Sequence, residues 1–157
     1  CELASGSIIL HWDDDDWMAP NRISYQVRSL LAHPHKQVCG LSRVVFYEPG
    51  RDRAWLYVHP AGSRGWLSGN TLCYHKRLWQ QHRFPDINEG EDTLFVWGLD
   101  ESLLLPLADS SFYVATVHPR NTSPKRTHHP HWQPYPVAGV HSVLQHDLGF
   151  YQSWRGA

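Results

Sequence analysis

The sequence predicts an α/β fold of a single domain, and three consecutive features indicate it. The apolar run 7–12 has the length of a buried strand. Four aspartates follow the run at once, and Pro20 is placed to open a helix. Open α/β sheets bind their ligands at strand ends, so the aspartates stand where a ligand site is expected. The chain has 157 residues, which is enough to bury a core.

The next elements are a helix and a β-hairpin. The helix, over 20–33, should pack on the strand of 7–12, which we expect to be internal to its sheet. The apolar residues at helical spacing that would make this contact are Ile23, Val27, Leu30 and Leu31. Two strand-like runs, 38–47 and 54–58, are separated by the turn signal Pro49-Gly50 and predict a hairpin.

The C-terminal half alternates short elements with loops. The expected elements are an extended piece at 69–74, helices at 75–81 and 91–99, strands at 103–105 and 112–117, and a terminal amphipathic helix at 141–154. The segment 119–136 is rich in Pro, His, Thr and Asn, which predicts a long loop.

Composition excludes several classes of protein. With 14 basic and 15 acidic residues the net charge is −1, whereas a nucleic-acid-binding surface would give a basic excess. No apolar stretch reaches about 18 residues, so we expect no membrane span. The three cysteines lack zinc-site spacing and favour a reducing compartment, which we take to be the cytoplasm. Because the chain begins with Cys1 rather than Met, we expect it to be a piece of a longer protein.

Four consecutive carboxylates, from Asp13 to Asp16, are the first candidate site. Each like-charged neighbour raises the cost of ionising the next, so a bound cation would stabilise the cluster. Alternate residues of an extended chain share a face, which pairs Asp13 with Asp15 and Asp14 with Asp16. A D-x-D pair can hold a divalent metal, and the metal can hold a diphosphate. A solvated acidic turn without a partner is the alternative.

A second acidic pair, Glu91 and Asp92, stands at the expected start of a helix. The helix dipole stabilises carboxylates there, so both can be ordinary first-turn residues. The functional alternative makes Asp92 an ionised general base that takes a proton from a substrate hydroxyl. His118, at a strand end, is a candidate metal ligand, although one histidine among twelve is weak evidence by itself.

Three glycines lie next to candidate strands or carboxylates: Gly6, Gly69 and Gly90. Glycine permits either a close approach of the backbone to another group or a turn with positive φ. The sequence leaves both explanations open.

In their order along the chain, these motifs resemble family 2 glycosyltransferases of the GT-A fold. Residues 4–20 are similar to the family's D-x-D segment, in which a glycine precedes a strand, the acidic motif and a helix-opening proline. Its acceptor-side half, where the aspartate of a Glu-Asp pair is the usual base, is similar to three later stretches: 69–79, 83–85 and 90–95. The resemblance covers about residues 4–123.

The resemblance implies a GT-A-like mixed, mainly parallel sheet flanked by helices. It implies a partial GT-A domain at residues 1–123, followed by a loop and helix extension at 124–157. In the family a long segment that forms most of the nucleotide-base pocket precedes the D-x-D strand, whereas Asp13 here follows only twelve residues. We therefore expect the fold to be incomplete at its N-terminal side.

The implied reaction is a hexosyltransferase-type transfer of a sugar, with inversion, from a nucleotide-diphosphate sugar to an acceptor hydroxyl. The acceptor, a sugar, a lipid-linked group or a protein, is not identified by the sequence. The nucleotide-sugar site would contain the four consecutive carboxylates Asp13, Asp14, Asp15 and Asp16. The ligands of Mn²⁺ or Mg²⁺ would be Asp15, Asp13 and His118, because a late metal-binding histidine is common in GT-A enzymes. Asp92 would deprotonate the acceptor hydroxyl, and Glu91 would position the acceptor or the loop before it.

Two other classes stay open. One is a non-catalytic carbohydrate- or protein-interaction module derived from a glycosyltransferase. The other is a nucleotidyltransferase, which also uses paired aspartates and a metal. The Glu91-Asp92 helix start and the sequence Asn121-Thr122-Ser123 favour a glycosyltransferase over the nucleotidyltransferase.

Overall fold

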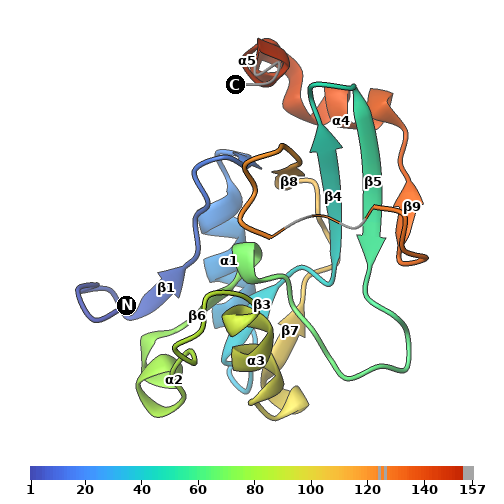
Figure 1. The fold of residues 1–157 in the computed structure, drawn as a ribbon. Helices are drawn as coiled ribbons and strands as arrows, with labels where there is room; N and C mark the ends of the chain where they lie inside the picture. Colours follow the sequence, from blue (N-terminus) through green and yellow to red (C-terminus); the bar gives the residue numbers. More distant parts are fainter. Residues whose placement is uncertain (124, 126, 154–157) are drawn as a thin grey trace.

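A computed structural model gives the structure of residues 1–123, 125 and 127–153, which form two mixed β-sheets with helices around them (Figure 1). The first sheet contains, in spatial order, β1 (Ile8–Leu10), β6 (Cys73–His75), β3 (Val38–Gly40) and β7 (Leu104–Pro106). The second contains β2 (Trp17–Met18), β8 (Tyr113–Thr116), β4 (Arg43–Glu48), β5 (Arg53–Val58) and β9 (Trp132–Pro134). The predicted α/β class is confirmed.

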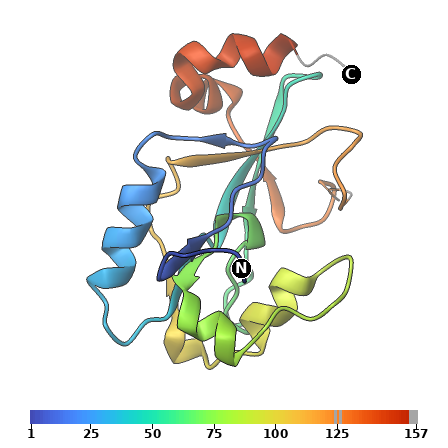
Figure 2. The ribbon, with the colours of Figure 1, turned by 90° about the vertical axis from the view of Figure 1, so that its left-hand side faces the viewer.

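The helices cover both sheets. α1 (Arg22–Leu31) and α2 (Lys76–Gln81) contact the first sheet, and α4 (Val137–Leu144) contacts β4 and β5 of the second. Figure 2 shows α1 along one side of the molecule and the C-terminal helices across its top. The other helical segments are α3 (Glu91–Trp97), α5 (Leu148–Ser153) and the 3₁₀ turns η1 (Gly69–Thr71), η2 (Glu101–Leu103) and η3 (Gln145–Asp147). Within the described ranges, no helix combines the length and apolar character needed to cross a bilayer.

The direction of the strands corrects the expectation of a mainly parallel sheet. Among the described strands only β3–β7 and β4–β8 pair in parallel, and the other pairs are antiparallel. A parallel pair needs a crossover of a dozen or more residues, whereas the tight turn between β4 and β5 allows only antiparallel pairing. The expectation that 7–12 is an internal strand is also wrong, because β1 stands at the edge of its sheet.

Helix α1 turns a largely polar face to the core. Its buried residues are Arg22, Gln26 and Leu30. Ile23 and Leu31 are 54% and 58% exposed, so the expectation that they pack on the core is wrong. Val27 and Leu30 do pack, together with Cys39 and Cys73 of the first sheet. The helix is therefore rotated relative to the orientation that its apolar residues alone predict.

Hydrogen bonds explain why α1 buries polar side chains. Arg22 Nη2 donates to the backbone carbonyls of His11, at 2.7 Å, and Asn70, at 2.9 Å. Gln26 Nε2 donates to the carbonyl of Thr71 at 2.7 Å. Buried polar groups are tolerated when they are paired in this way. Both side chains thereby tie α1 to the segment before the aspartates and to the turn η1.

Most other elements lie where the sequence predicts them. The hairpin is confirmed as β4–β5, although β3, from the same predicted run, joins the first sheet. The expected loop at 119–136 contains one strand, β9, which pairs with β5. The expected terminal helix is divided into α4 and α5, and its expected last residue, Trp154, lies outside the described residues.

Candidate active site

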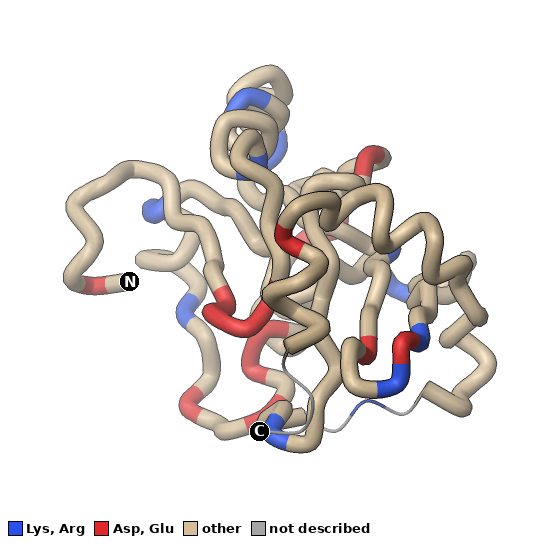
Figure 3. Tube along the Cα trace, turned by 90° about the horizontal axis from the view of Figure 1, so that it is seen from above, with Lys and Arg blue, Asp and Glu red and all other residues tan. Residues whose placement is uncertain are grey.

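The aspartate run connects the two sheets, because it lies between β1 and β2. It forms a continuous acidic stretch of the trace in Figure 3. Asp13, Asp15 and Asp16 each offer one carboxylate oxygen, and these three atoms lie within 4.8 Å of one another. Asp13 and Asp15 are together, as expected for a D-x-D pair. Asp16, expected to face away with Asp14, joins them instead.

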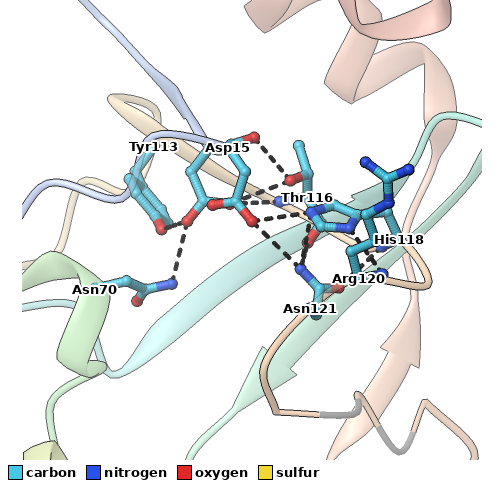
Figure 4. A network of polar contacts seen from close by, with 8 residues as sticks. Asp15, Asn70, Tyr113, Thr116, His118, Arg120 and Asn121 are labelled. Carbon is cyan, nitrogen blue, oxygen red and sulfur yellow. Dashed lines mark hydrogen bonds and ion pairs between the residues drawn. The ribbon is translucent and has the colours of Figure 1, made fainter. Parts of the chain in front are cut away.

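Asp16 is fixed by hydrogen bonds within the protein, and its partners Asn70, Tyr113 and Thr116 are labelled in Figure 4. Its carboxylate accepts from the Thr116 backbone N–H at 2.7 Å, from the Tyr113 hydroxyl and from Asn70 Nδ2 at 3.4 Å. Burial nevertheless raises the pKa of Asp16 to about 6. Asp16 therefore anchors the acidic loop to β8 and to η1.

Asp15 is paired with His118, 103 residues later in the chain (Figure 4). Asp15 Oδ2 lies 2.9 Å from His118 Nε2 and 3.4 Å from Asn121 Nδ2. His118 Nδ1 accepts from the Arg120 backbone N–H at 3.2 Å, and Asn121 Nδ2 lies 3.2 Å from His118 Nε2. The late histidine thus lies beside the D-x-D carboxylate.

The two acidic motifs face a common space. Asp13 and Asp92 line a cavity of about 600 Å³, together with His11 and Gly69. A neighbouring cavity of about 750 Å³ is lined by all of Asp13, Asp14, Asp15, Glu91 and Asp92. Burial, and then the neighbouring Asp15 carboxylate, raise the pKa of Asp13. Asp14 thus borders the larger cavity but is not among the three clustered carboxylates.

Asp92 is held at the start of α3 by close contacts. Its side chain packs against Gly69, where a Cβ atom would lie 1.7 Å from Asp92 Oδ2. Its Oδ1 accepts from the Thr93 backbone N–H at 2.6 Å. Gly90, just before α3, has a φ of 79°, which glycine adopts readily. Position 69 therefore requires glycine because the Asp92 side chain lies so close, and position 90 because of its positive φ. A Cβ on Gly6 would meet only an ordinary van der Waals contact.

Several residues of this site are not evident from the sequence. His11 Nδ1 lies 2.8 Å from the Gly69 carbonyl and its Nε2 lies 3.2 Å from the Tyr74 hydroxyl, while burial lowers the pKa of His11. The Arg22 guanidinium lies 5.4 Å from the centroid of the Trp12 ring and is buried. The spacing of Arg22 and Gln26, one helical turn apart, is the one signal that could have revealed this buried polar face.

The arrangement has the chemical elements of a metal-assisted transfer site. The ligand atoms close enough to share an ion belong to Asp13, Asp15 and Asp16, and His118 contacts only Asp15 among them. Carboxylate oxygens suit both Mg²⁺ and Mn²⁺. Asp92 is not among the clustered carboxylates, but it borders both cavities, as Asp13 does, and Asp15 borders the larger one. A separate carboxylate of this kind can act on a substrate proton.

Comparison with known proteins leaves the family open. No protein-family model matches the sequence, and no curated protein matches it. The resemblance to glycosyltransferases therefore remains a proposal.

Proposed function

We propose that this chain is the catalytic, acceptor-side part of an inverting, metal-dependent glycosyltransferase, which transfers a hexose-type sugar from a nucleotide-diphosphate donor to an acceptor hydroxyl. One observation carries the proposal. The clustered carboxylates of Asp13 and Asp15 and the separate carboxylate of Asp92 border one continuous acidic space, with His118 bonded to Asp15. This is the layout that a metal-bound donor and a deprotonated acceptor require.

Asp15, Asp13 and His118 are the residues that would hold Mn²⁺ or Mg²⁺. When bound, the ion would neutralise the charge on the leaving diphosphate. His118 Nε2 and Asp15 Oδ2 lie 2.9 Å apart, so an ion held by both would take the place of their mutual hydrogen bond. Asp16, anchored to Thr116 and Tyr113, would keep the loop in place while the ligands rearrange.

Asp92 would take the proton of the acceptor hydroxyl. The hydroxyl oxygen then attacks the anomeric carbon from the face away from the departing diphosphate, which inverts the configuration. The Thr93 N–H and the backbone of Gly69 fix the Asp92 side chain, so the carboxylate is already held in one position when the acceptor binds. Glu91 borders both cavities and is suited to positioning the acceptor.

A second candidate function is a non-catalytic carbohydrate- or protein-interaction module derived from such an enzyme. The observation that favours it is the internal pairing of the aspartates. Asp15 bonds His118 and Asn121, and Asp16 bonds Thr116, so the acidic loop has protein partners of its own. Such pairing would stabilise the loop without a metal.

Turnover with a panel of nucleotide sugars and simple acceptors, in Mn²⁺ or in EDTA, separates the two functions. We expect nucleoside-diphosphate release that depends on Mn²⁺, and a product of inverted anomeric configuration by NMR. Asp92→Asn should lower the turnover about 10²-fold, in line with general-base contributions, and leave Mn²⁺ affinity unchanged. The exposed Asp86, outside both cavities, provides the control Asp86→Asn. Near-normal turnover of Asp92→Asn, or no release with any donor, would contradict the enzymatic proposal.

A further inference from the structure

Four aromatic side chains that line the 600 Å³ cavity contact one another in a row: Phe46, Trp132, Tyr57 and Trp66. The ring centroids of Phe46 and Trp132 are 4.5 Å apart, those of Trp132 and Tyr57 are 5.5 Å apart, and those of Tyr57 and Trp66 are 5.3 Å apart. Tyr57, Trp66 and Trp132 are only half-buried. Part of each of these rings is therefore available to a ligand in the cavity.

Contacts behind the row hold Trp66 in a fixed orientation. The Trp66 indole stacks on His59, with centroids 5.4 Å apart and the ring planes 23° from parallel. Its Nε1–H donates to Thr93 Oγ1 at 3.3 Å. Thr93 follows Asp92 in α3, so the row is joined directly to the helix that carries the candidate base. A ligand ring on Trp66 would therefore have a defined position relative to Asp92.

The rest of the cavity wall is polar, with several carboxylates and the ammonium group of Lys125. Ser68 and Asn70 offer hydroxyl and amide groups, and Glu89, Glu91 and Asp92 offer carboxylates. An apolar ligand would desolvate these groups without pairing them, which is unfavourable. A phosphate or uronate could pair with Lys125, whose Nζ lies 5.9 Å from the centroid of the Phe46 ring, but it would also meet several carboxylates of its own charge sign. The volume lies within the ~300–1,000 Å³ of small-molecule pockets.

An uncharged sugar can contact both the aromatic and the polar side chains of the cavity. The C–H face of a pyranose ring is apolar and can pack on an aromatic ring, while its hydroxyls donate to carboxylates and to amide oxygens. We propose that the row of Phe46, Tyr57, Trp66 and Trp132 is a carbohydrate subsite, in which an uncharged sugar stacks on Trp66 and presents a hydroxyl towards Asp92. The identification of this sugar as the acceptor rests on the proposed function, whereas the binding itself does not.

Calorimetric titration of the chain with neutral tetrasaccharides tests the subsite. The probes are cellotetraose, maltotetraose, mannotetraose and tetra-N-acetylchitotetraose, with tetragalacturonate as the anionic counterpart. We expect at least one neutral probe to bind and tetragalacturonate not to bind. Trp66→Ala should weaken the binding by about tenfold or more, and Trp66→Phe, which keeps a ring, should retain most of it. Trp97, exposed on α3 and outside the cavity, gives the control Trp97→Ala.

Three results would overturn the subsite: no binding of any neutral probe, equal affinity in Trp66→Ala and the parent, or binding of tetragalacturonate as tight as that of the neutral probes. Asp15→Asn should leave carbohydrate affinity unchanged, since Asp15 does not line this cavity. A chain that binds sugar through Trp66 but binds neither Mn²⁺ nor a nucleotide sugar would support the subsite and contradict glycosyl transfer. A chain with Mn²⁺-dependent donor turnover but without sugar binding would support glycosyl transfer and contradict the subsite.

Discussion

The Asp92 carboxylate fills the space in which a side chain at Gly69 would begin. A Cβ atom on Gly69 would lie 1.7 Å from Asp92 Oδ2 and 2.4 Å from its Cγ. Gly69 opens the turn η1, whose next residue, Asn70, accepts a hydrogen bond from Arg22. Arg22 also bonds the carbonyl of His11, two residues before Asp13. The candidate base and the aspartate loop are thus positioned by one turn and one buried arginine.

Gly69→Ala should therefore displace Asp92, because the atoms that its Cβ would meet first all belong to Asp92 and none to the clustered aspartates. We expect turnover to fall about 10²-fold, as for loss of the base itself, while Mn²⁺ affinity stays at the parent value. Initial rates and calorimetry measure the two quantities. Gly50→Ala is the matched control, because a Cβ there meets nothing within 4 Å. A Gly69→Ala enzyme with near-normal turnover would show that the observed position of Asp92 is not required.

The orientation of α1 predicts unequal effects at two adjacent leucines. Leu30 is fully buried and Leu31 is 58% exposed. Leu30→Ala should lower the free energy of unfolding by about 2–5 kcal/mol, because it leaves a cavity in the core. Leu31→Ala should change it by no more than about 0.5 kcal/mol. Urea denaturation of both variants measures the difference, and equal losses would mean that α1 faces the core with another side.

The raised pKa of Asp16 predicts that the free energy of unfolding, measured in EDTA, depends on pH. The pKa of Asp16 is about 6 in the folded protein against the ordinary 3.8, so between these values the folded state holds a proton that the unfolded state releases. The free energy of unfolding should accordingly decrease as the pH rises from about 4 to about 6, by at most about 3 kcal/mol from this group. Asp16→Asn should remove this part of the slope. A variant with the same slope as the parent would refute the assignment.

The parts of the fold that depend on local pattern are predictable from sequence. Two strand-like runs and the turn signal Pro49-Gly50 between them predict the β4–β5 hairpin, which the structure contains. The rotation of α1 is not predictable in this way, because Arg22 and Gln26 are buried only by virtue of carbonyl partners in distant segments. Strand β9 lies in a Pro- and His-rich segment whose composition predicts a loop. Its Trp132 packs on Phe46 and Tyr57 of the second sheet.

The candidate site shows the same division. The two-residue period of an extended chain pairs Asp13 with Asp15, which the structure also brings together. The two-residue period cannot predict the anchoring of Asp16, because its partners Tyr113 and Thr116 are 97 and 100 residues away in the sequence. The aromatic row is likewise assembled from separate strands and a loop, so no local motif marks it.

Calorimetric titration of the chain with Mn²⁺ alone tests the central claim most directly, because it requires neither donor nor acceptor. The clustered carboxylates and His118 predict binding of about one ion per chain. Asp15→Asn should weaken this binding by about tenfold or more, while Asp86→Asn, an exposed carboxylate outside the cluster, should leave it unchanged. Absence of Mn²⁺ binding by the parent chain, or equal affinity in Asp15→Asn and Asp86→Asn, would contradict the account.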